Sequence, residues 1–311
     1  MMSNRSPQSF TKHEVNQVSP PTQAGPSSLQ LTVVVCTCRL ESAVRCCRQI
    51  RSCLSPADLI LVVLDCADDT SALRSELAEC GAETICNVTN LGLSYSRNLA
   101  LEVATLRHIM FVDDDVWLNY EVVDGVRAAF ASGSAVVGVR LLPSAKVDLD
   151  RWFLTPSQFH YLGIHRSDRK ANTWGACMGV DASVVRSNGL TFKENLGRAG
   201  TGLQSGDDTT LIRELVRCGE RESFLDGLSV EHRFDPKRVQ LYYLVRRAYW
   251  QGRSEVRRSN ALRGLWKEVR RNCDTDSVRG LLLAFLYVGS VVGGISFELL
   301  SGGVARIRGG R

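Results

Sequence analysis

Residues 108–115 read HIMFVDDD, an apolar run that ends in three consecutive aspartates. The first five residues, His108–Val112, have the apolar composition of a buried strand. Adjacent carboxylates repel one another unless a cation or a positively charged ligand neutralises them. Mg²⁺ and Mn²⁺ prefer oxygen ligands and commonly share phosphate oxygens with one or two carboxylates. The stretch therefore predicts a metal and diphosphate site, with a solvated acidic loop or the acidic start of a following helix as alternatives.

Strands and helices alternate on the N-terminal side of this stretch. The expected order is strand 31–35, helix 43–54, strand 59–64, helix 70–80, strand 83–88, helix 94–106 and strand 108–112. Such alternation is typical of a parallel sheet with helices on both faces, whose ligands bind outside the carboxyl ends of the strands. We therefore expect polar residues at or just past the strand ends to converge on one edge. These residues are Thr37, Arg39, Asp65, Asp68, Asn90 and Asp113.

The rest of the chain is less regular. The elements expected there are a helix at 120–131, strands at 135–141, 173–180 and 223–230, and helices beginning at 182 and 207. A loop rich in glycine, residues 197–206, precedes the last of these helices.

Positive charge is concentrated in one mostly helical segment. Between Lys237 and Arg271 there are eleven Lys or Arg and two Glu, whereas the net charge of the whole chain is only +5. Such a segment attracts phosphate groups, either on a ligand or on a lipid surface. Its Arg238, Arg246 and Arg247 can therefore reach phosphates or simply face solvent or lipid. Because no nucleic-acid-binding signature lies near the segment, no nucleic-acid partner is expected.

An apolar tail follows the basic segment. Residues Leu281–Phe297 number seventeen and are interrupted by Gly289, Gly293 and Gly294, whereas a membrane span usually needs about 20 residues. A helix that packs on the protein or lies at a membrane interface therefore competes with a true span. Gly289 and Gly293 form a GxxxG pattern, which is a weak signal for helix packing.

The N-terminus and the cysteines indicate the compartment. Residues 1–30 are rich in Ser, Pro, Gln and Thr and contain no apolar signal core, so we expect a disordered leader. The eleven cysteines include no CxxC spacing, which argues against a zinc site and a disulfide framework. We expect a cytoplasmic protein, with peripheral contact to the inner face of the plasma membrane through the C-terminal segment.

The chain from about Leu31 to Gly252 carries an ordered series of motifs. They are, in order, Val33–Arg39 (VVVCTCR), Val62–Thr70 (VVLDCADDT), Asn90–Asn98 (NLGLSYSRN), Phe111–Asp115 (FVDDD), Gly175–Met178 (GACM) and Asp207-Asp208. This series resembles glycosyltransferase family 2. Two positions depart from the family pattern, since Cys177 replaces the Asn of its Gly-Ala-Asn element and Asp207 replaces the Glu of its Glu-Asp element.

The resemblance implies a fold and a division into domains. The fold class is α/β, a GT-A type Rossmann-like mixed sheet flanked by helices, with a C-terminal helical appendage. Residues 31–252 would form the glycosyltransferase domain, and residues 253–311 the basic and apolar appendage.

The resemblance also implies the donor-binding residues. Thr37, Arg39, Asp65 and Asp68 would line the base and ribose of a nucleotide-sugar donor. Arg97 would lie near its diphosphate or sugar, and Asp113 and Asp114 would also contact the donor. The residues alone leave alternatives open, because Asp65 and Asp68 can cap the next helix and Arg97 can be a surface arginine.

By the same resemblance, Asp113, Asp115 and His232 would hold Mg²⁺ or Mn²⁺. Asp208 would be the general base that takes a proton from the acceptor hydroxyl, with Asp207 as its acidic neighbour. The alternatives are that Gly206-Asp207-Asp208 is only an acidic helix start and that His232 is structural. Trp174 can stack on an acceptor sugar or pack in the core.

The expected function is the metal-dependent transfer of a sugar from a nucleoside-diphosphate donor to an acceptor hydroxyl, with inversion. The acceptor would be a glycan, a glycolipid or a small molecule. A sugar-1-phosphate nucleotidyltransferase is the second hypothesis, although the turn after the first strand, Thr37–Glu41, lacks the glycines of that class. A degenerate protein that binds a nucleotide sugar without catalysis is the third.

Overall fold

The computed structural model describes residues 29–65, 71–144, 156–166, 171–259, 261–272 and 278–308. Most of the expected leader, residues 1–28, and the predicted donor residue Asp68 lie outside the described residues.

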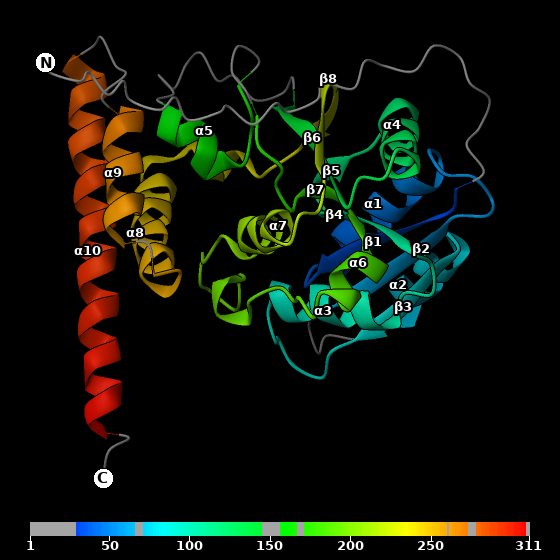
Figure 1. The fold of residues 1–311 in the computed structure, drawn as a ribbon, viewed down its shortest axis with the longest axis horizontal. Coiled ribbons are helices and arrows are strands. Elements are labelled where there is room, and N and C mark those ends of the chain that lie inside the picture. Colours follow the sequence, from blue (N-terminus) through cyan, green and yellow to red (C-terminus); the bar gives the residue numbers. More distant parts are fainter. Residues whose placement is uncertain are drawn as a thin grey trace, which may run out of the picture.

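The first half of the chain forms the expected parallel unit (Figure 1). Its elements are β1 (Leu31–Thr37), α1 (Leu40–Arg51), β2 (Leu59–Leu64), α2 (Ser71–Glu79), β3 (Ala82–Cys86), α3 (Leu93–Val103) and β4 (His108–Val112). β1 pairs in parallel with both β2 and β4, and β3 pairs in parallel with β2. The alternation predicted from the sequence is therefore confirmed.

The second half makes the sheet mixed. Its strands are β5 (Val116–Trp117), β6 (Val136–Pro143), β7 (Cys177–Asp181) and β8 (Glu222–His232), and the order across the sheet is β3-β2-β1-β4-β7-β6-β8-β5. β7 runs antiparallel to β4 and β6, whereas β6 and β8 are parallel. The arrangement agrees with the predicted mixed sheet of the GT-A type. The short strand β5, which pairs with β8, was not predicted.

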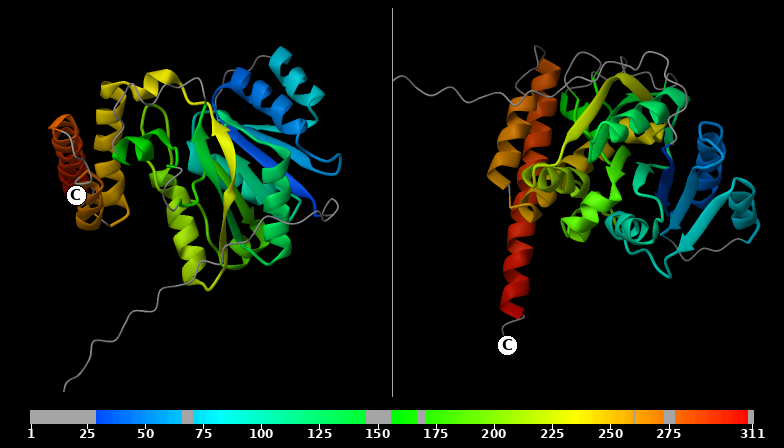
Figure 2. Two further views of the ribbon diagram at one scale, coloured as in Figure 1. Left: turned by 90° about the horizontal axis from the view of Figure 1, so that it is seen from above. Right: turned by 45° about the vertical axis from the view of Figure 1, so that its right-hand side comes forward.

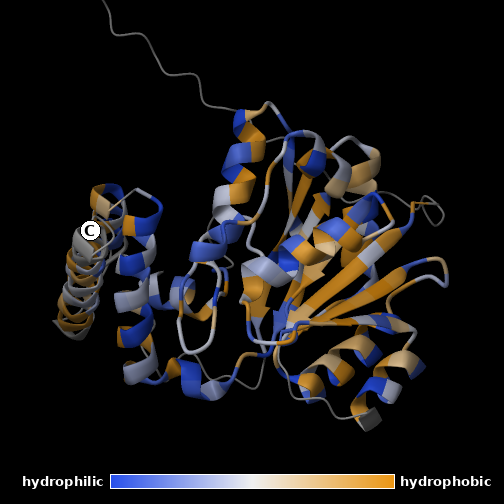
Figure 3. Cartoon of the chain, turned by 90° about the horizontal axis from the view of Figure 1, so that it is seen from below, coloured by the Kyte–Doolittle hydropathy of each residue, from blue (hydrophilic) through white to orange (hydrophobic). Residues whose placement is uncertain are grey.

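Helices cover both faces of the sheet. Besides α1 and α3 they are α4 (Tyr120–Ala131), α6 (Ala182–Ser187) and α7 (Asp207–Arg217). α5 (Pro156–Leu162) packs in a separate apolar core, and short 3-10 helices lie at Glu194–Leu196 and Pro236–Val239. Successive side chains of a strand point to opposite faces, so a strand covered on both sides must be apolar throughout. Val33 and Val35 of β1 pack in the core with α1 and α4, whereas Val34 packs with α3, α6 and α7. The strands are accordingly the most continuous hydrophobic stretches in Figure 3.

The strand expected at 173–180 begins only at Cys177. The backbone of Gly175 is used elsewhere, because its amide donates to the Asp208 carboxylate at 2.7 Å and its carbonyl accepts from Arg97 at 3.0 Å. These bonds hold residues 173–176 as a loop beside the start of α7.

Three helices stand at one end of the molecule, beside the sheet (Figures 1 and 2). They are α8 (Leu241–Arg257), α9 (Ala261–Asn272) and α10 (Val278–Arg308), and their apolar residues share a core with α5. α8 continues across the predicted domain boundary at residue 252. The division into domains at that residue stays a prediction.

α10 packs against α8 through glycines other than the GxxxG pair. A Cβ at Gly294 would lie 1.9 Å from the Tyr249 carbonyl oxygen, and one at Gly252 would lie 2.0 Å from the Val291 carbonyl oxygen. Around Gly289 no described atom lies within 4 Å of such a Cβ, and at Gly293 the nearest is 3.9 Å away. Gly293 therefore borders the Tyr249 side chain of α8 without a close backbone approach, whereas Gly289 takes no part in the contact, and the two backbones meet at Gly252 and Gly294 instead of at the GxxxG pair.

Within the described residues, one helical stretch is long and apolar enough to cross a membrane by length and composition alone. It is Gly280–Ser301 of α10, and 28% of its apolar window is buried inside the molecule.

Candidate functional site

The three aspartates after β4 point to three different sets of partners. Asp114 faces β1, where the Thr37 hydroxyl and the Arg39 guanidinium both donate to its carboxylate, the Arg39 Nε at 3.2 Å. These partners meet because β1 and β4 are parallel neighbours, which places their carboxyl ends at the same edge of the sheet. The structure thus brings together three of the residues predicted to bind the donor.

Asp115 faces the end of β8. Its Oδ1 lies 3.3 Å from His232 Nε2, and its Oδ2 lies 3.1 Å from Arg238 Nη2. Burial acts to raise the pKa of Asp115, but the hydrogen bond from His232 and the charges of His232 and Arg238 outweigh it and hold the pKa below its ordinary range. The predicted association of His232 with the aspartates is therefore present in the fold.

The tautomer of His232 decides whether its Nε2 carries a hydrogen toward the carboxylate of Asp115. Its Nδ1 lies 3.0 Å from the Gly163 carbonyl oxygen, which only accepts, so Nδ1 carries a hydrogen. In the neutral ring Nε2 then presents a lone pair to the carboxylate of Asp115. Two acceptors at this distance require a proton or a cation between them.

Asp113 is joined to the start of α7 by a buried arginine. Arg97 of α3, which is 3% exposed, donates from Nη2 to Asp113 Oδ1 at 3.3 Å and from Nη1 to Asp207 Oδ2 at 2.8 Å. Burial raises the pKa of Asp113, and the charges of Asp115 and Asp114 act in the same direction against the opposing charge of Arg97. The burial of Arg97 excludes the alternative of a surface arginine.

Asp65, predicted to bind the donor nucleotide, forms a turn. Its carboxylate accepts hydrogen bonds at 2.8 Å from the side chain of Asn87 and from the backbone amides of Leu91 and Gly92. Asp65 thereby holds the Asn-Leu-Gly turn that leads into α3. A ribose contact would use the lone pair that these bonds leave on Oδ2.

Asp208 lies at the beginning of α7, one residue after the aspartate that pairs with Arg97. Its Oδ2 accepts from the Gly175 amide at 2.7 Å and its Oδ1 accepts from the Thr209 amide at 2.6 Å, which fixes the orientation of the carboxylate. Burial raises the pKa of Asp208, and the neighbouring charge of Asp207 raises it further. Such a carboxylate is a stronger base than one in water.

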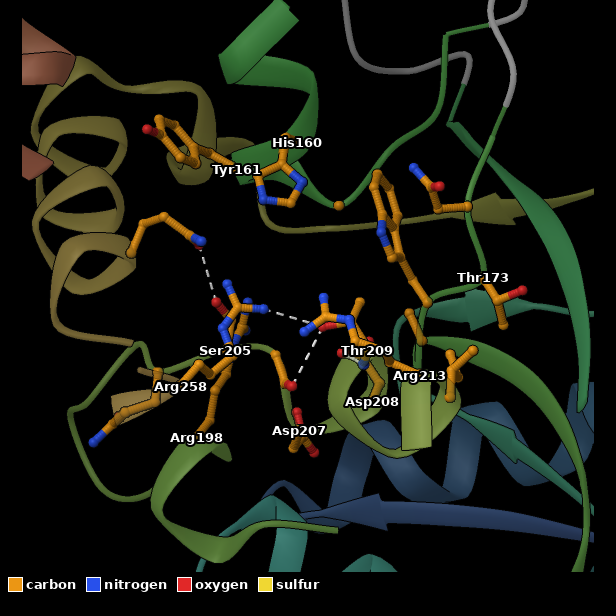
Figure 4. Close-up of a pocket in the computed structure, with 18 of the residues that line it drawn as sticks. His160, Tyr161, Thr173, Arg198, Ser205, Asp207, Asp208, Thr209, Arg213 and Arg258 are labelled. Carbon is orange, nitrogen blue, oxygen red and sulfur yellow. Dashed lines mark hydrogen bonds between the residues drawn. The ribbon is translucent and has the colours of Figure 1, made fainter. Parts of the chain in front are cut away.

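A pocket of about 540 Å³ opens between α7 and the C-terminal helices. Asp113, Asp207 and Asp208 form its acidic side, and Figure 4 shows His160 and Tyr161 of α5 across the pocket from Asp207. Basic side chains complete it, among them Arg198, Arg213, Arg238, Arg247, Arg258 and Lys267. Sequence analysis missed Arg198, Arg213 and Arg258 as site residues. Arg258 belongs to the basic segment that was noticed, whereas Arg198 and Arg213 lie outside it and carried no signal.

Trp174 lines the same pocket. Its ring stacks on His165, with ring centroids 4.0 Å apart and planes inclined by 13°. The side chain therefore packs on a neighbour and also borders the cavity, and stacking on an acceptor sugar stays a prediction.

Comparisons with known proteins agree with this architecture. The family model of glycosyl transferase family 2 matches residues 32–188, half of the 311-residue chain. The glucosyl-dolichyl phosphate glucuronosyltransferase of Haloferax volcanii is 24% identical over 243 residues, which cover 73% of this chain and 76% of that protein.

Two solved structures share the fold. S. aureus TarS in complex with UDP-GlcNAc is 14% identical, has a TM-score of 0.51 and aligns over 87% of this chain and 90% of its own. The mannosyltransferase PcManGT of Pyrobaculum calidifontis in complex with GDP-Man and Mn²⁺ is 15% identical, has a TM-score of 0.52 and aligns over 88% and 79%. The motif series, the mixed sheet and the family match lead to one conclusion: the chain belongs to glycosyl transferase family 2 and is a nucleotide-sugar glycosyltransferase.

Proposed function

We propose that the enzyme transfers a sugar with inversion and that Asp208 is its general base. In this reaction the acceptor oxygen bonds to the anomeric carbon, the bond from that carbon to the diphosphate breaks, and the hydroxyl proton passes to the Asp208 carboxylate. One observation carries the proposal. Asp208 borders the same pocket as Asp113, is oriented by two backbone amides and has a raised pKa.

The residues of this chain also fit a divalent cation at Asp115 and His232. Among the described residues no group of three or more Asp, Glu, His and Cys could hold a metal. Mg²⁺ and Mn²⁺ nevertheless often take only one or two protein ligands and complete their shell with water and phosphate oxygens. His232 Nε2 and Asp115 Oδ1, 3.3 Å apart, would both turn a lone pair to such a cation once the proton between them is lost, and Asp113 is the further candidate ligand. When bound, the cation would neutralise charge on the departing diphosphate.

Among the described residues, those proposed to hold the base and ribose of the donor lie outside the pocket that Asp208 borders. Thr37, Arg39 and Asp65 lie at the ends of β1 and β2, and Asp68 follows in the sequence. The complexes of TarS with UDP-GlcNAc and of PcManGT with GDP-Man and Mn²⁺ support a nucleoside-diphosphate sugar and a divalent cation for this chain as well.

We further propose a lipid-linked acceptor and contact with the cytoplasmic face of a membrane. The Haloferax relative is named for a dolichyl-phosphate-linked acceptor. In this chain, α10 exposes large apolar side chains, among them Leu282 and Phe285, which are 66% and 76% exposed. Glu298 of α10 pairs with Arg253 and Arg257 of α8 at 2.6 and 2.8 Å, so the helix is anchored to the folded body. Peripheral contact fits this arrangement better than a free-standing span.

The Asp208→Asn variant tests the proposed base. We expect its kcat for sugar transfer to fall by about 10²–10⁴-fold, the usual contribution of a general base. Nucleotide-sugar affinity in the presence of Mn²⁺ should stay within about twofold, because the base acts on the acceptor. Glu121→Gln, an exposed acid on α4, is the matched control and should behave as wild type. Equal transfer by Asp208→Asn and wild type would contradict the assignment.

A pH profile and metal removal complete the test. The base works deprotonated, so the rate falls as the pH drops through its pKa. Because burial and Asp207 raise that pKa, the fall should begin above the region of an ordinary aspartate, about pH 3.9. A chelator should abolish transfer and Mn²⁺ should restore it.

A further inference from the structure

Arg247 of α8 carries a buried charge that has no ion-pair partner among the described residues. The residue is 5% exposed, and its one hydrogen bond runs from Nη1 to Gln251 Oε1 at 3.3 Å. Its Nε is buried and has no hydrogen-bond partner. Within the described residues it forms no ion pair, and the face of Tyr161 lies 5.9 Å from its guanidinium carbon. A buried cation normally has a counter-ion, so this one indicates a missing anion.

A second cation, Arg198, lines the same pocket as Arg247. It lies in the loop before α7 and forms no ion pair with any described residue. Burial acts to lower its pKa, but the charges of Tyr243, Asp113, Asp115 and Asp207 outweigh burial and raise it. Burial and the charge of Arg198 together lower the pKa of Arg247 to about 10. An anion between them would relieve both their repulsion and their desolvation.

A third donor, the hydroxyl of Tyr243, lies about one helical turn before Arg247 on α8. The Tyr243 hydroxyl is buried and has no hydrogen-bond partner. Burial acts to raise the pKa of Tyr243, but the charges of Arg198, Arg238 and Arg247 outweigh it and lower the pKa. Two guanidinium groups and one hydroxyl are donors suited to the several oxygens of a phosphate group.

The position of the cluster indicates which substrate carries this phosphate. The pocket contains Asp208, Arg198 and Arg247, and Arg97, Asp113 and His232 line it as well. The residues predicted to hold the base and ribose of the donor, Thr37, Arg39 and Asp65, are not among the residues that line it. Arg238, the other cation near Tyr243, is already paired with Asp115. The cluster therefore lies in the pocket of the proposed base and away from the residues predicted to hold the base and ribose of the donor.

We propose that Arg198 and Arg247, assisted by the Tyr243 hydroxyl, bind a phosphate group of the acceptor, so that the acceptor is a phosphate-bearing molecule rather than a neutral glycan. This inference rests on the proposed function, because it takes Asp208 to mark the acceptor side. The same chemistry would suit the donor diphosphate, and the experiment separates the two sources.

Thermal unfolding with inorganic phosphate, in the presence of a chelator and without nucleotide, is the first measurement. Phosphate should raise the melting temperature of wild type, because a ligand that binds only the folded state stabilises it. In Arg247→Gln we expect the phosphate Kd to rise by at least about tenfold, and in Arg247→Lys by less, because the charge is kept. Arg221→Gln removes an exposed cation at the start of β8 and should match wild type.

The second measurement uses UDP and GDP with Mn²⁺. Whichever nucleotide stabilises wild type should bind Arg247→Gln with a Kd within about twofold of wild type. If Arg247→Gln raised the Kd of that nucleotide as much as it raised the Kd of phosphate, the cluster would bind the donor and the proposal would be overturned. It would equally be overturned if phosphate did not stabilise wild type, or if Arg247→Gln and wild type responded alike.

Two controls keep the outcomes distinct. Asp208→Asn should bind phosphate as wild type does, so a wrong assignment of the base leaves this test intact. Near-ultraviolet circular dichroism of Arg247→Gln and Arg247→Lys, with an unchanged spectrum in both, shows that a lost response is not a loss of folding. If Arg247→Gln alone unfolds, Arg247→Lys and Arg198→Gln supply the comparison, and an unchanged phosphate Kd in both would reject the subsite.

Discussion

At the scale of single residues, the site depends on Arg97. Its guanidinium lies between Asp113 and Asp207, which are far apart in the chain, and it also donates to the Gly175 carbonyl. A Cβ at Gly175 would lie 2.9 Å from the Arg97 guanidinium nitrogens, so the glycine gives this side chain its place. One buried cation thus positions the strand end that carries the aspartates relative to the helix that carries the proposed base.

We expect Arg97→Gln to lower the free energy of unfolding by about 3–5 kcal/mol, because it leaves buried carboxylates without their counter-ion. Arg48→Gln is the matched control, since Arg48 pairs with Glu76 at 2.7 Å but is 57% exposed. Such a surface pair contributes about 0–1 kcal/mol. Urea unfolding measures both variants, and similar losses in the two would show that Arg97 is not the support described here.

At the scale of elements, the crossing of α8 and α10 decides where the C-terminal helices sit. Gly252 and Gly294 allow the two backbones to touch, and ion pairs from Arg253 and Arg257 to Glu298 hold the far end of the crossing. α8 also carries Arg247, so the crossing helps to hold the basic side chains of the pocket in place.

We expect Gly294→Ala to destabilise the fold by about 1–3 kcal/mol, since its methyl group would meet the Tyr249 carbonyl oxygen and force the helices apart. Gly289→Ala is the control on the same helix. Its methyl group meets open space, so the higher helix propensity of alanine should stabilise the protein by about 0.5–1 kcal/mol. The melting temperatures of the two variants should therefore shift in opposite directions. Equal shifts would contradict the close backbone contact of α8 and α10 at Gly294.

At the scale of the whole molecule, a catalytic sheet lies on one side and an apolar helix on the other (Figures 1 and 3). α10 exposes Leu282 and Phe285, and Trp266 of α9 is 63% exposed. The pocket opens beside these helices, so an acceptor held in a membrane would approach it from their side.

We expect wild type to sediment with vesicles that contain anionic lipids and the double variant Leu282→Ser, Phe285→Ser to bind them at least about tenfold more weakly. Each buried apolar side chain contributes about 1.5–3 kcal/mol. Val88→Ser is the control, because Val88 is 86% exposed but follows β3, at the β3 edge of the sheet. Membrane contact would lose its support if wild type stayed in the supernatant, or if wild type, the double variant and Val88→Ser all bound the vesicles equally.

The sequence by itself determined the parallel half of the sheet and the place of the aspartates. β4 runs from His108 to Val112 as predicted, and α4 runs from Tyr120 to Ala131 as predicted. Both follow from local causes, the period of the apolar side chains and the asparagine cap at Asn119, which a single stretch of sequence contains. The carboxyl ends of parallel strands share an edge, so the meeting of Thr37, Arg39 and Asp114 was predictable as well.

Only the tertiary structure decided the pairing of Arg97 with Asp207, the cluster of Arg198 and Arg247, and which glycines α8 and α10 use to pack. These contacts join residues brought together by the packing of whole elements, and a rotation of one helix by a single residue would exchange their partners. Local periodicity places a side chain on a helix or a strand. The choice between burial against a distant partner and exposure to water depends on the shape of the surfaces that meet, which no single stretch of sequence contains.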